Sequence, residues 1–227
     1  MKLIISAEHG GNLIPEEYKF LFNEHGDELA THRGYDPGTE DLFYYLKDIS
    51  AFAKLNTTSR LLIEFNRSLH HVNLFSVYSK KLGKNHQKSL IEAYYLPYRN
   101  AVEEQIKKEI VNKNKVLHIS LHSFTPQLGE QIRTNDIGLL YDPKRPAEKE
   151  ITRTFKEELN KLSPEIKIRF NYPYLGSADG FTTYLRKLFP ENYLGIELEI
   201  NQKWVKNGKF PQKLKTDIKT VVSHLVN

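Results

Sequence analysis

Short apolar runs alternate with longer amphipathic segments along the chain, and the two patterns predict different elements. The short runs are rich in Ile, Leu, Val, Tyr and Phe and are bounded by polar or turn-forming residues, which is typical of strands. The predicted strands are Lys2–Ala7, Arg60–Phe65, Val116–Leu121, Ile137–Tyr141, Ile166–Asn171 and Tyr193–Ile200. The longer segments place apolar residues at helical spacing. The predicted helices are Gly38–Ala53, Lys84–Asn112, Ala147–Leu162, Phe181–Leu188 and Pro211–Leu225.

The order of these elements indicates the fold class. Strands that alternate with helices predict an α/β fold, with a mostly parallel, mixed central sheet and helices on both of its faces. The sequence contains no Ser/Gly-rich linker, no shift in composition and no internal repeat. We therefore expect a single domain over residues 1–227.

Polar residues gather where the predicted strands end. In an open α/β sheet the ligand binds outside the carboxyl ends of the strands. Four predicted strands run into the polar sequences EHGGN, EFNRS, LHSF and ELEIN. A polar residue at one strand end is commonplace, but four such ends predict a site at one rim of the sheet. The residues expected at this rim are His9, Asn66, Arg67, His122, Ser123 and Glu199.

Composition narrows the chemistry that this rim can perform. The chain contains no Cys, which excludes disulfides, thiolate catalysis and zinc sites with Cys ligands. The formal net charge is +5, but the Lys residues are scattered among Glu, so we expect an anionic small molecule rather than nucleic acid as the partner. Since no apolar run is long enough for a signal peptide or a membrane span, we expect a cytoplasmic protein without a membrane partner.

Two histidines at the ends of predicted strands suggest a metal site. His9 and His122, together with a carboxylate, form a donor set that suits Zn²⁺ with an open position for water. Asp36 in RGYDPGT is the candidate third ligand; the alternative is that it only caps the turn before the following helix. Glu8 is adjacent to His9 and is expected to point to the opposite face of the strand. The two glycines of HGGN are expected to let the backbone approach the metal closely.

Two carboxylates in YLGIELEINQ lie on the same face of a largely apolar strand. Burying Glu197 and Glu199 there is costly unless they are paired or functional. Glu199, nearer the strand end, is the candidate general base, taking a proton from the attacking water and returning it to the leaving amine. The alternative is a structural ion pair with an arginine such as Arg60.

Arginines supply candidate groups for binding an anionic substrate. Arg67, together with Asn66, is suited to hold a substrate carboxylate, because a guanidinium binds carboxylates through two parallel hydrogen bonds. Arg133 in EQIRTNDIGLL offers a second substrate-binding cation. Arg60 and Arg133 are equally compatible with ordinary surface charges.

The ordered set of motifs resembles the N-formylglutamate amidohydrolase family. The resembling segments span residues 6–202 and are SAEHGGNLIP, YDPGTEDL, SRLLIEFNRSLHHVNLFS, HISLHSFTP, RTNDIGLLYD, NYPYLG and IELEINQ. The resemblance implies a fold related to that of the zinc carboxypeptidases and the aspartoacylase-type amidohydrolases, and a zinc-dependent hydrolysis of an amide bond.

The resemblance also implies roles for individual residues. The implied zinc ligands are His9, Asp36 and His122. The residues implied to bind the substrate carboxylate are Asn66 and Arg67. The implied catalytic residues are Glu199 and Arg60. Arg60 is expected to help stabilise the oxyanion. Asn12 stands where the carboxypeptidase pattern has a Glu ligand three residues after the first His, and this departure leaves the third ligand open. The resemblance favours Asp36, because the family usually keeps an Asp in the Asp-Pro-Gly stretch.

These observations lead to one expected function and two alternatives. We expect a zinc-dependent amidohydrolase that cleaves the amide bond of small anionic N-acyl amino acids, such as N-formylglutamate. The alternatives are a peptidase of the zinc carboxypeptidase type and a non-catalytic binding protein with the same fold. The segment 69–83 is long enough to form a lid over the site.

Overall fold

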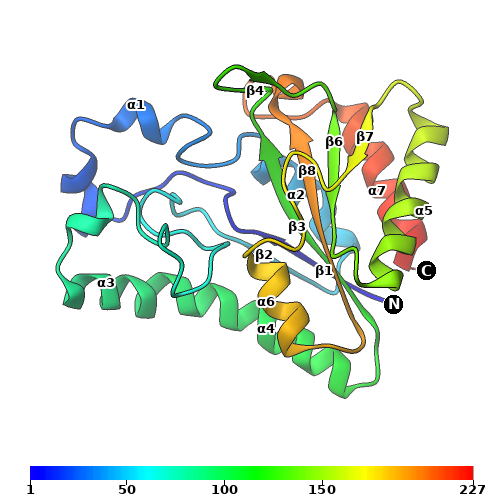
Figure 1. The fold of residues 1–227 in the computed structure, drawn as a ribbon, viewed down its shortest axis with the longest axis horizontal. Helices are drawn as coiled ribbons and strands as arrows, with labels where there is room; N and C mark the ends of the chain where they lie inside the picture. The colour runs from blue at the N-terminus through cyan, green and yellow to red at the C-terminus, as the bar shows by residue number, and fades with distance from the viewer. Residues whose placement is uncertain (227) are drawn as a thin grey trace.

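The computed structural model describes residues 1–226, and in these residues the centre of the molecule is a mixed six-stranded sheet (Figure 1). In spatial order the strands are β2 (Phe52–Leu55), β1 (Lys2–Ala7), β3 (Val116–Phe124), β8 (Tyr193–Asn201), β6 (Ile137–Leu140) and β7 (Ile168–Phe170). Strand β6 runs antiparallel to β8, and the other neighbouring pairs are parallel. The prediction of an α/β fold around a mostly parallel, mixed sheet is confirmed.

Helices cover both faces of this sheet, because successive strand residues point to opposite sides. The face that carries Ile5 and Ile119 packs against α2 (Thr39–Leu46), α5 (Pro146–Leu162) and α7 (Gln212–Val226). The face that carries Ile4 and Val116 packs against α4 (Leu96–Val111) and α6 (Phe181–Leu188). Figure 1 shows α5 and α7 together beside β7, with α4 and α6 on the other side of the sheet.

Most predicted helices are confirmed. The predicted helix over Lys84–Asn112 is α3 (Lys84–Leu90), a π-helical segment (Ile91–Tyr95) and α4 in continuous succession. The predictions for α5, α6 and α7 differ from the observed bounds by at most one residue at either end. The short elements α1 (Gly26–Leu29) and the β4–β5 hairpin (Gln127–Leu128 and Gln131–Ile132) were not predicted. Within residues 1–226, no helix is both long and apolar enough to cross a membrane.

The predicted strand Arg60–Phe65 is wrong. This segment is a series of turns, although Leu61, Leu62, Ile63 and Phe65 are buried in the core beside α4. A short apolar run fits any buried segment, so periodicity alone cannot separate a strand from a buried loop. The residues that follow therefore reach the site from a loop and not from a strand end.

The end of the predicted helix Gly38–Ala53 is also wrong. The helix α2 stops at Leu46, a 3₁₀ turn follows, and β2 then begins at Phe52. Strand β2 lies at the sheet edge and pairs with β1, where Phe52 is opposite Ile4. Its half-buried side chains do not alternate clearly between apolar and polar, so the short strand is merged with the helical pattern before it.

Candidate metal centre and active site

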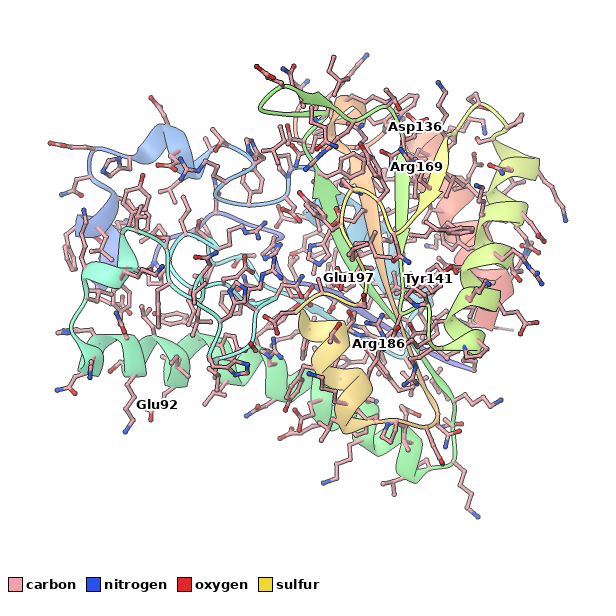
Figure 2. The ribbon with its side chains drawn as sticks, in the orientation of Figure 1. Glu92, Asp136, Tyr141, Arg169, Arg186 and Glu197 are labelled. Carbon is pink, nitrogen blue, oxygen red and sulfur yellow. The ribbon has the colours of Figure 1, made fainter. Side chains whose placement is uncertain are left out.

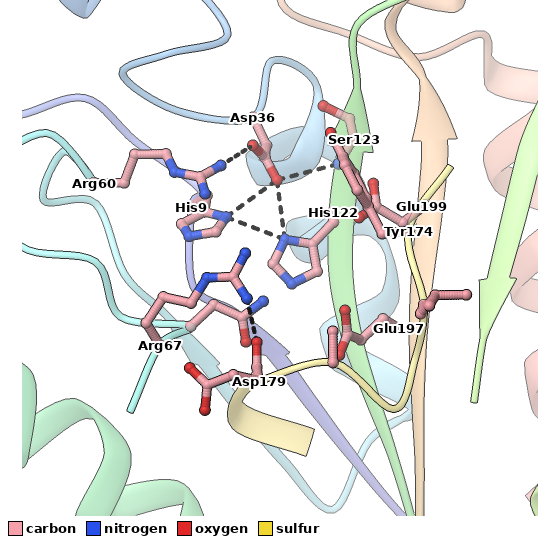
Figure 3. Close-up of a pocket in the computed structure, with 13 residues that line it drawn as sticks. His9, Asp36, Arg60, Arg67, His122, Ser123, Tyr174, Asp179, Glu197 and Glu199 are labelled. Carbon is pink, nitrogen blue, oxygen red and sulfur yellow. Dashed lines mark hydrogen bonds and ion pairs between the residues drawn. The ribbon is translucent and has the colours of Figure 1, made fainter. Parts of the chain in front are cut away.

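Three buried side chains meet at the carboxyl ends of β1 and β3 (Figure 3). His9 lies two residues after β1, His122 lies on β3, and Asp36 lies in the loop before α2. The Nδ1 atoms of His9 and His122 are 3.2 Å apart. Asp36 Oδ2 lies 3.4 Å from His9 Nδ1 and 3.0 Å from His122 Nδ1. One ligand atom from each residue lies within 4.8 Å of the others, a spacing at which the three can hold one metal ion.

The fold explains why these residues converge. Strands β1 and β3 are parallel neighbours, so their carboxyl ends lie side by side. The Asp36 N–H donates to the His9 carbonyl at 2.9 Å, and the Ser123 N–H donates to Asp36 Oδ2 at 3.3 Å. The N-cap residue of α2 is Gly38, with no side-chain cap. The side chain of Asp36 thus faces the histidines and is not a helix cap.

Carboxylates also bind the far ring nitrogen of each histidine. Glu8 Oε2 lies 3.2 Å from His122 Nε2, and Glu64 Oε1 contacts His9 Nε2. Such carboxylate–histidine pairs fix the ring orientation and raise the basicity of the ligating nitrogen. The donor set and its fixed orientation therefore fit Zn²⁺. Glu64 carries no signal in the sequence, because its partner His9 is remote in the chain.

The charges of this group are strongly coupled. Burial lowers the pKa of His122, but hydrogen bonds with Asp36 and Glu8 outweigh burial and raise this pKa well above its ordinary value. Burial raises the pKa values of Glu8 and Asp36, but the neighbouring histidines outweigh burial and hold both pKa values well below their ordinary range. Without metal, protons on the histidines thus balance the carboxylates, and a bound cation would take the place of such protons.

The variant Glu8→Gln is expected to bind zinc about 10- to 100-fold more weakly, because the amide keeps the size of Glu8 but removes the charge that holds His122. A competition titration with a chelator measures this affinity. The exposed Glu104→Gln is the matched control and should bind zinc as the wild type does. Equal affinities in the two variants would contradict the role of Glu8.

Glu199 presents a carboxyl group beside His9, Asp36 and His122. It lies opposite His122 in the β3–β8 register and is 4% exposed. Its Oε2 atom is buried and has no hydrogen-bond partner among the described residues. Burial raises the pKa of Glu199 to about 8. Arg60 pairs with Glu64 (Nε to Oε2, 2.8 Å) and with Asp36 (Nη1 to Oδ1, 3.5 Å), so the alternative ion pair between Arg60 and Glu199 is not formed.

A cavity of about 290 Å³ opens in front of these groups. Besides the metal-binding group and Glu199, its walls include Arg60, Asn66, Arg67, Tyr174, Asp179 and Glu197. The Arg67 guanidinium donates through Nη1 to the Asp179 carbonyl, and Asn66 Oδ1 accepts from the Phe181 N–H at 2.7 Å. The predicted substrate-binding residues Asn66 and Arg67 thus lie in the same cavity as the metal-binding group. No residue of the segment 69–83 is among those that line it.

Arg133, the other predicted substrate-binding residue, lies behind the cavity wall. It is buried, and its Nη1 atom donates to the Tyr174 hydroxyl at 3.2 Å. The Tyr174 ring also lies beneath the Arg133 guanidinium, 5.1 Å from it. Arg133 therefore contacts the cavity only through Tyr174.

The two glycines after His9 lie in a tightly packed loop. A Cβ atom added to Gly10 would lie 2.2 Å from Leu55 Cδ1, and one added to Gly11 would lie 2.5 Å from the Thr57 carbonyl oxygen. The glycines are required because the loop packs tightly against the chain that leaves β2. Their expected role in the approach to a metal stays a prediction.

Comparisons with known proteins agree with this description. The family model of N-formylglutamate amidohydrolase matches residues 1–205. A search of curated protein sequences gives no significant match.

Among solved structures, a gene product of Agrobacterium tumefaciens is similar, with 22% identity and a TM-score of 0.81 over 99% of this chain and 88% of that chain. An N-formylglutamate amidohydrolase from Ralstonia eutropha JMP134 has 17% identity and a TM-score of 0.79 over 99% of this chain and 93% of that chain. A metallo-carboxypeptidase from Burkholderia cenocepacia is more distant, with 13% identity and a TM-score of 0.43 over 99% of this chain and 57% of that chain.

Proposed function

The chain belongs to the N-formylglutamate amidohydrolase family, and from this premise we propose that it is a zinc-dependent amidohydrolase that cleaves the amide bond of N-acyl amino acids. The observation that carries the proposal is the buried group of His9, Asp36 and His122 beside Glu199, whose Oε2 atom has no hydrogen-bond partner in the described part of the chain. The cavity in front of this group contains Arg67, a cation suited to a substrate carboxylate.

Several polar groups of the cavity have a place in such a reaction. His9, Asp36 and His122 would hold Zn²⁺, which would polarise the amide carbonyl and activate water. Glu199 accepts the proton of the attacking water and delivers it to the leaving nitrogen, so that a carboxylic acid and a free amine form.

The two cavity arginines act on different parts of the substrate. Arg60 donates to the carbonyl oxygen as negative charge develops on it. Arg67, with Asn66, holds the carboxylate of the amino acid, which fixes the scissile bond beside Glu199.

A substrate panel tests this function against the two alternatives. The zinc-loaded protein is offered N-formyl and N-acetyl amino acids, dipeptides and peptidoglycan fragments, and release of free amine is measured. We expect turnover of the N-acyl amino acids. Faster cleavage of dipeptides or peptidoglycan fragments would indicate a peptidase, and no turnover of any compound would indicate a binding protein.

Zinc affinity is expected to increase between about pH 7 and pH 8, because zinc must displace protons from His9 and His122. Each displaced proton contributes about a tenfold increase per pH unit. The pKa of His122 in the metal-free protein is raised well above its ordinary value, and that of His9 is also raised, since Glu64 and Asp36 outweigh burial and Arg60. A metal ion must displace these protons, whereas a histidine of ordinary pKa is already deprotonated above about pH 7. Competition titrations at the two pH values measure the change, and a pH-independent affinity in this range would contradict it.

A further inference from the structure

The cavity contains two carboxylates that the proposed reaction does not use. Its arginines, among the residues that the structure describes, are Arg60 and Arg67. Arg60 is already paired with Glu64 and Asp36, so Arg67 is the cation left for a substrate carboxylate. Apart from the metal-binding group and Glu199, two acidic side chains, Asp179 and Glu197, also line the cavity.

Glu197 is held so that its charge faces the substrate. It points from β8 toward the start of α6, where Thr182 Oγ1 donates to Glu197 Oε1 at 2.6 Å (Figure 2). No cation among residues 1–226 forms an ion pair with Glu197 within 4.0 Å. The side chain is 8% exposed, and the cavity is where it meets solvent. A carboxylate in this position attracts an N–H donor and repels an anion.

Asp179 places a second negative charge on the wall of the cavity. Its Oδ2 atom accepts from the Ser68 N–H at 3.1 Å. Burial raises its pKa, but the hydrogen bond from Ser68 outweighs burial and keeps this pKa below its ordinary value, so the group is charged at neutral pH. Its backbone carbonyl accepts from Arg67, which orients that guanidinium while leaving other N–H groups free for a ligand.

A substrate with two carboxylates is therefore poorly matched to this cavity. The first carboxylate has Arg67 as its partner. The second would lie in a space of about 290 Å³ that also holds the carboxylates of Glu197 and Asp179. Like charges placed together in a partly buried site oppose binding strongly.

We propose that Glu197, with Asp179, selects N-acyl amino acids whose side chain carries an N–H donor, either an amide or a cation, and disfavours acidic ones such as N-formylglutamate. This inference rests on the proposed function, of which it specifies the substrate class. Glu197 acts as a specificity-determining residue, and its Thr182 hydrogen bond fixes the orientation of the carboxylate.

The test compares kcat/KM of the zinc-loaded wild type and Glu197→Gln on N-formylglutamate, N-formylglutamine and N-formyllysine. The first two substrates have the same size and differ in charge. The wild type is expected to favour glutamine or lysine over glutamate by at least about tenfold, and Glu197→Gln to reduce that ratio about tenfold. The faster of the glutamine and lysine substrates identifies the donor as amide or cation. Exposed Glu104→Gln should keep the wild-type ratio.

The outcomes separate this inference from the proposed function. A wild type that hydrolyses N-formylglutamate fastest would overturn the inference and leave the proposed function intact. An unchanged substrate ratio in an active Glu197→Gln would also overturn it. A wild type that hydrolyses none of the N-acyl amino acids would overturn both. The wild-type ratio tests the inference even if Glu197→Gln fails to fold.

Discussion

Glu199→Gln is expected to lower kcat by about 10²- to 10⁴-fold, the range for loss of a general acid–base. The amide has nearly the same shape as the carboxyl but cannot accept the proton of the attacking water or return it to the leaving nitrogen. Because Glu199 is not one of the three proposed zinc ligands, the zinc content of the variant should equal that of the wild type. Steady-state kinetics on the best N-acyl substrate, with elemental analysis of the same sample, measures both.

The matched control is Glu104→Gln, which makes the same chemical change at an exposed position on α4. It should retain full activity. A Glu199→Gln variant with wild-type kcat and a full complement of zinc would show that Glu199 is not the base. Loss of zinc from the variant would instead place Glu199 among the ligands.

Arg67→Met is expected to lower kcat/KM by about 10- to 100-fold for substrates with a free carboxylate, which matches the loss of a charge-assisted hydrogen bond in a partly buried site. Methionine fills a similar space without charge or donors. The loss should be much smaller for the corresponding amide of the substrate, which has no carboxylate for Arg67 to bind. Kinetics on an acid–amide substrate pair measures this difference.

Arg67→Lys shows how much of the effect comes from the positive charge of Arg67 and how much from its paired hydrogen bonds. Lysine keeps the positive charge but cannot form two parallel hydrogen bonds, so its kcat/KM should lie between those of the wild type and Arg67→Met. Arg153→Met, at an exposed position on α5, is the control and should change neither value. Equal losses for the acid and the amide in Arg67→Met would contradict carboxylate binding by Arg67.

Much of the fold could be predicted because its strands and helices have distinct apolar patterns. The buried strands β1, β3 and β8 are short and rich in Ile and Leu, and α5 and α6 are amphipathic. The errors fall on Arg60–Phe65 and on β2. The first is apolar because it is buried as a loop, and the second is half-buried at an edge, so neither has the pattern that distinguishes a strand.

Part of the site could also be predicted from the order of the strands. His9 and His122 could be predicted because parallel neighbouring strands place their carboxyl ends together. Asn66 and Arg67 line the cavity as expected, although they come from a loop and not from a strand.

The carboxylates that support the histidines could not be predicted. Glu8 lies one residue beyond β1, and its carboxylate reaches His122 on the neighbouring strand. Glu64 contacts His9 only because the loop between β2 and α3 folds back over the sheet. Such contacts depend on three-dimensional proximity between remote segments, which spacing along the sequence does not encode.

Elemental analysis of the purified wild type and of His122→Ala tests the metal site most directly. A protein that has never been exposed to chelators is expected to contain about one zinc ion per chain, because three buried donors hold a single ion. His122→Ala removes one of the three donors and should lose most of the metal, while circular dichroism shows whether the fold is kept. A wild type without metal, or a folded His122→Ala with the same metal content as the wild type, would contradict the assignment of His9, Asp36 and His122 as its ligands.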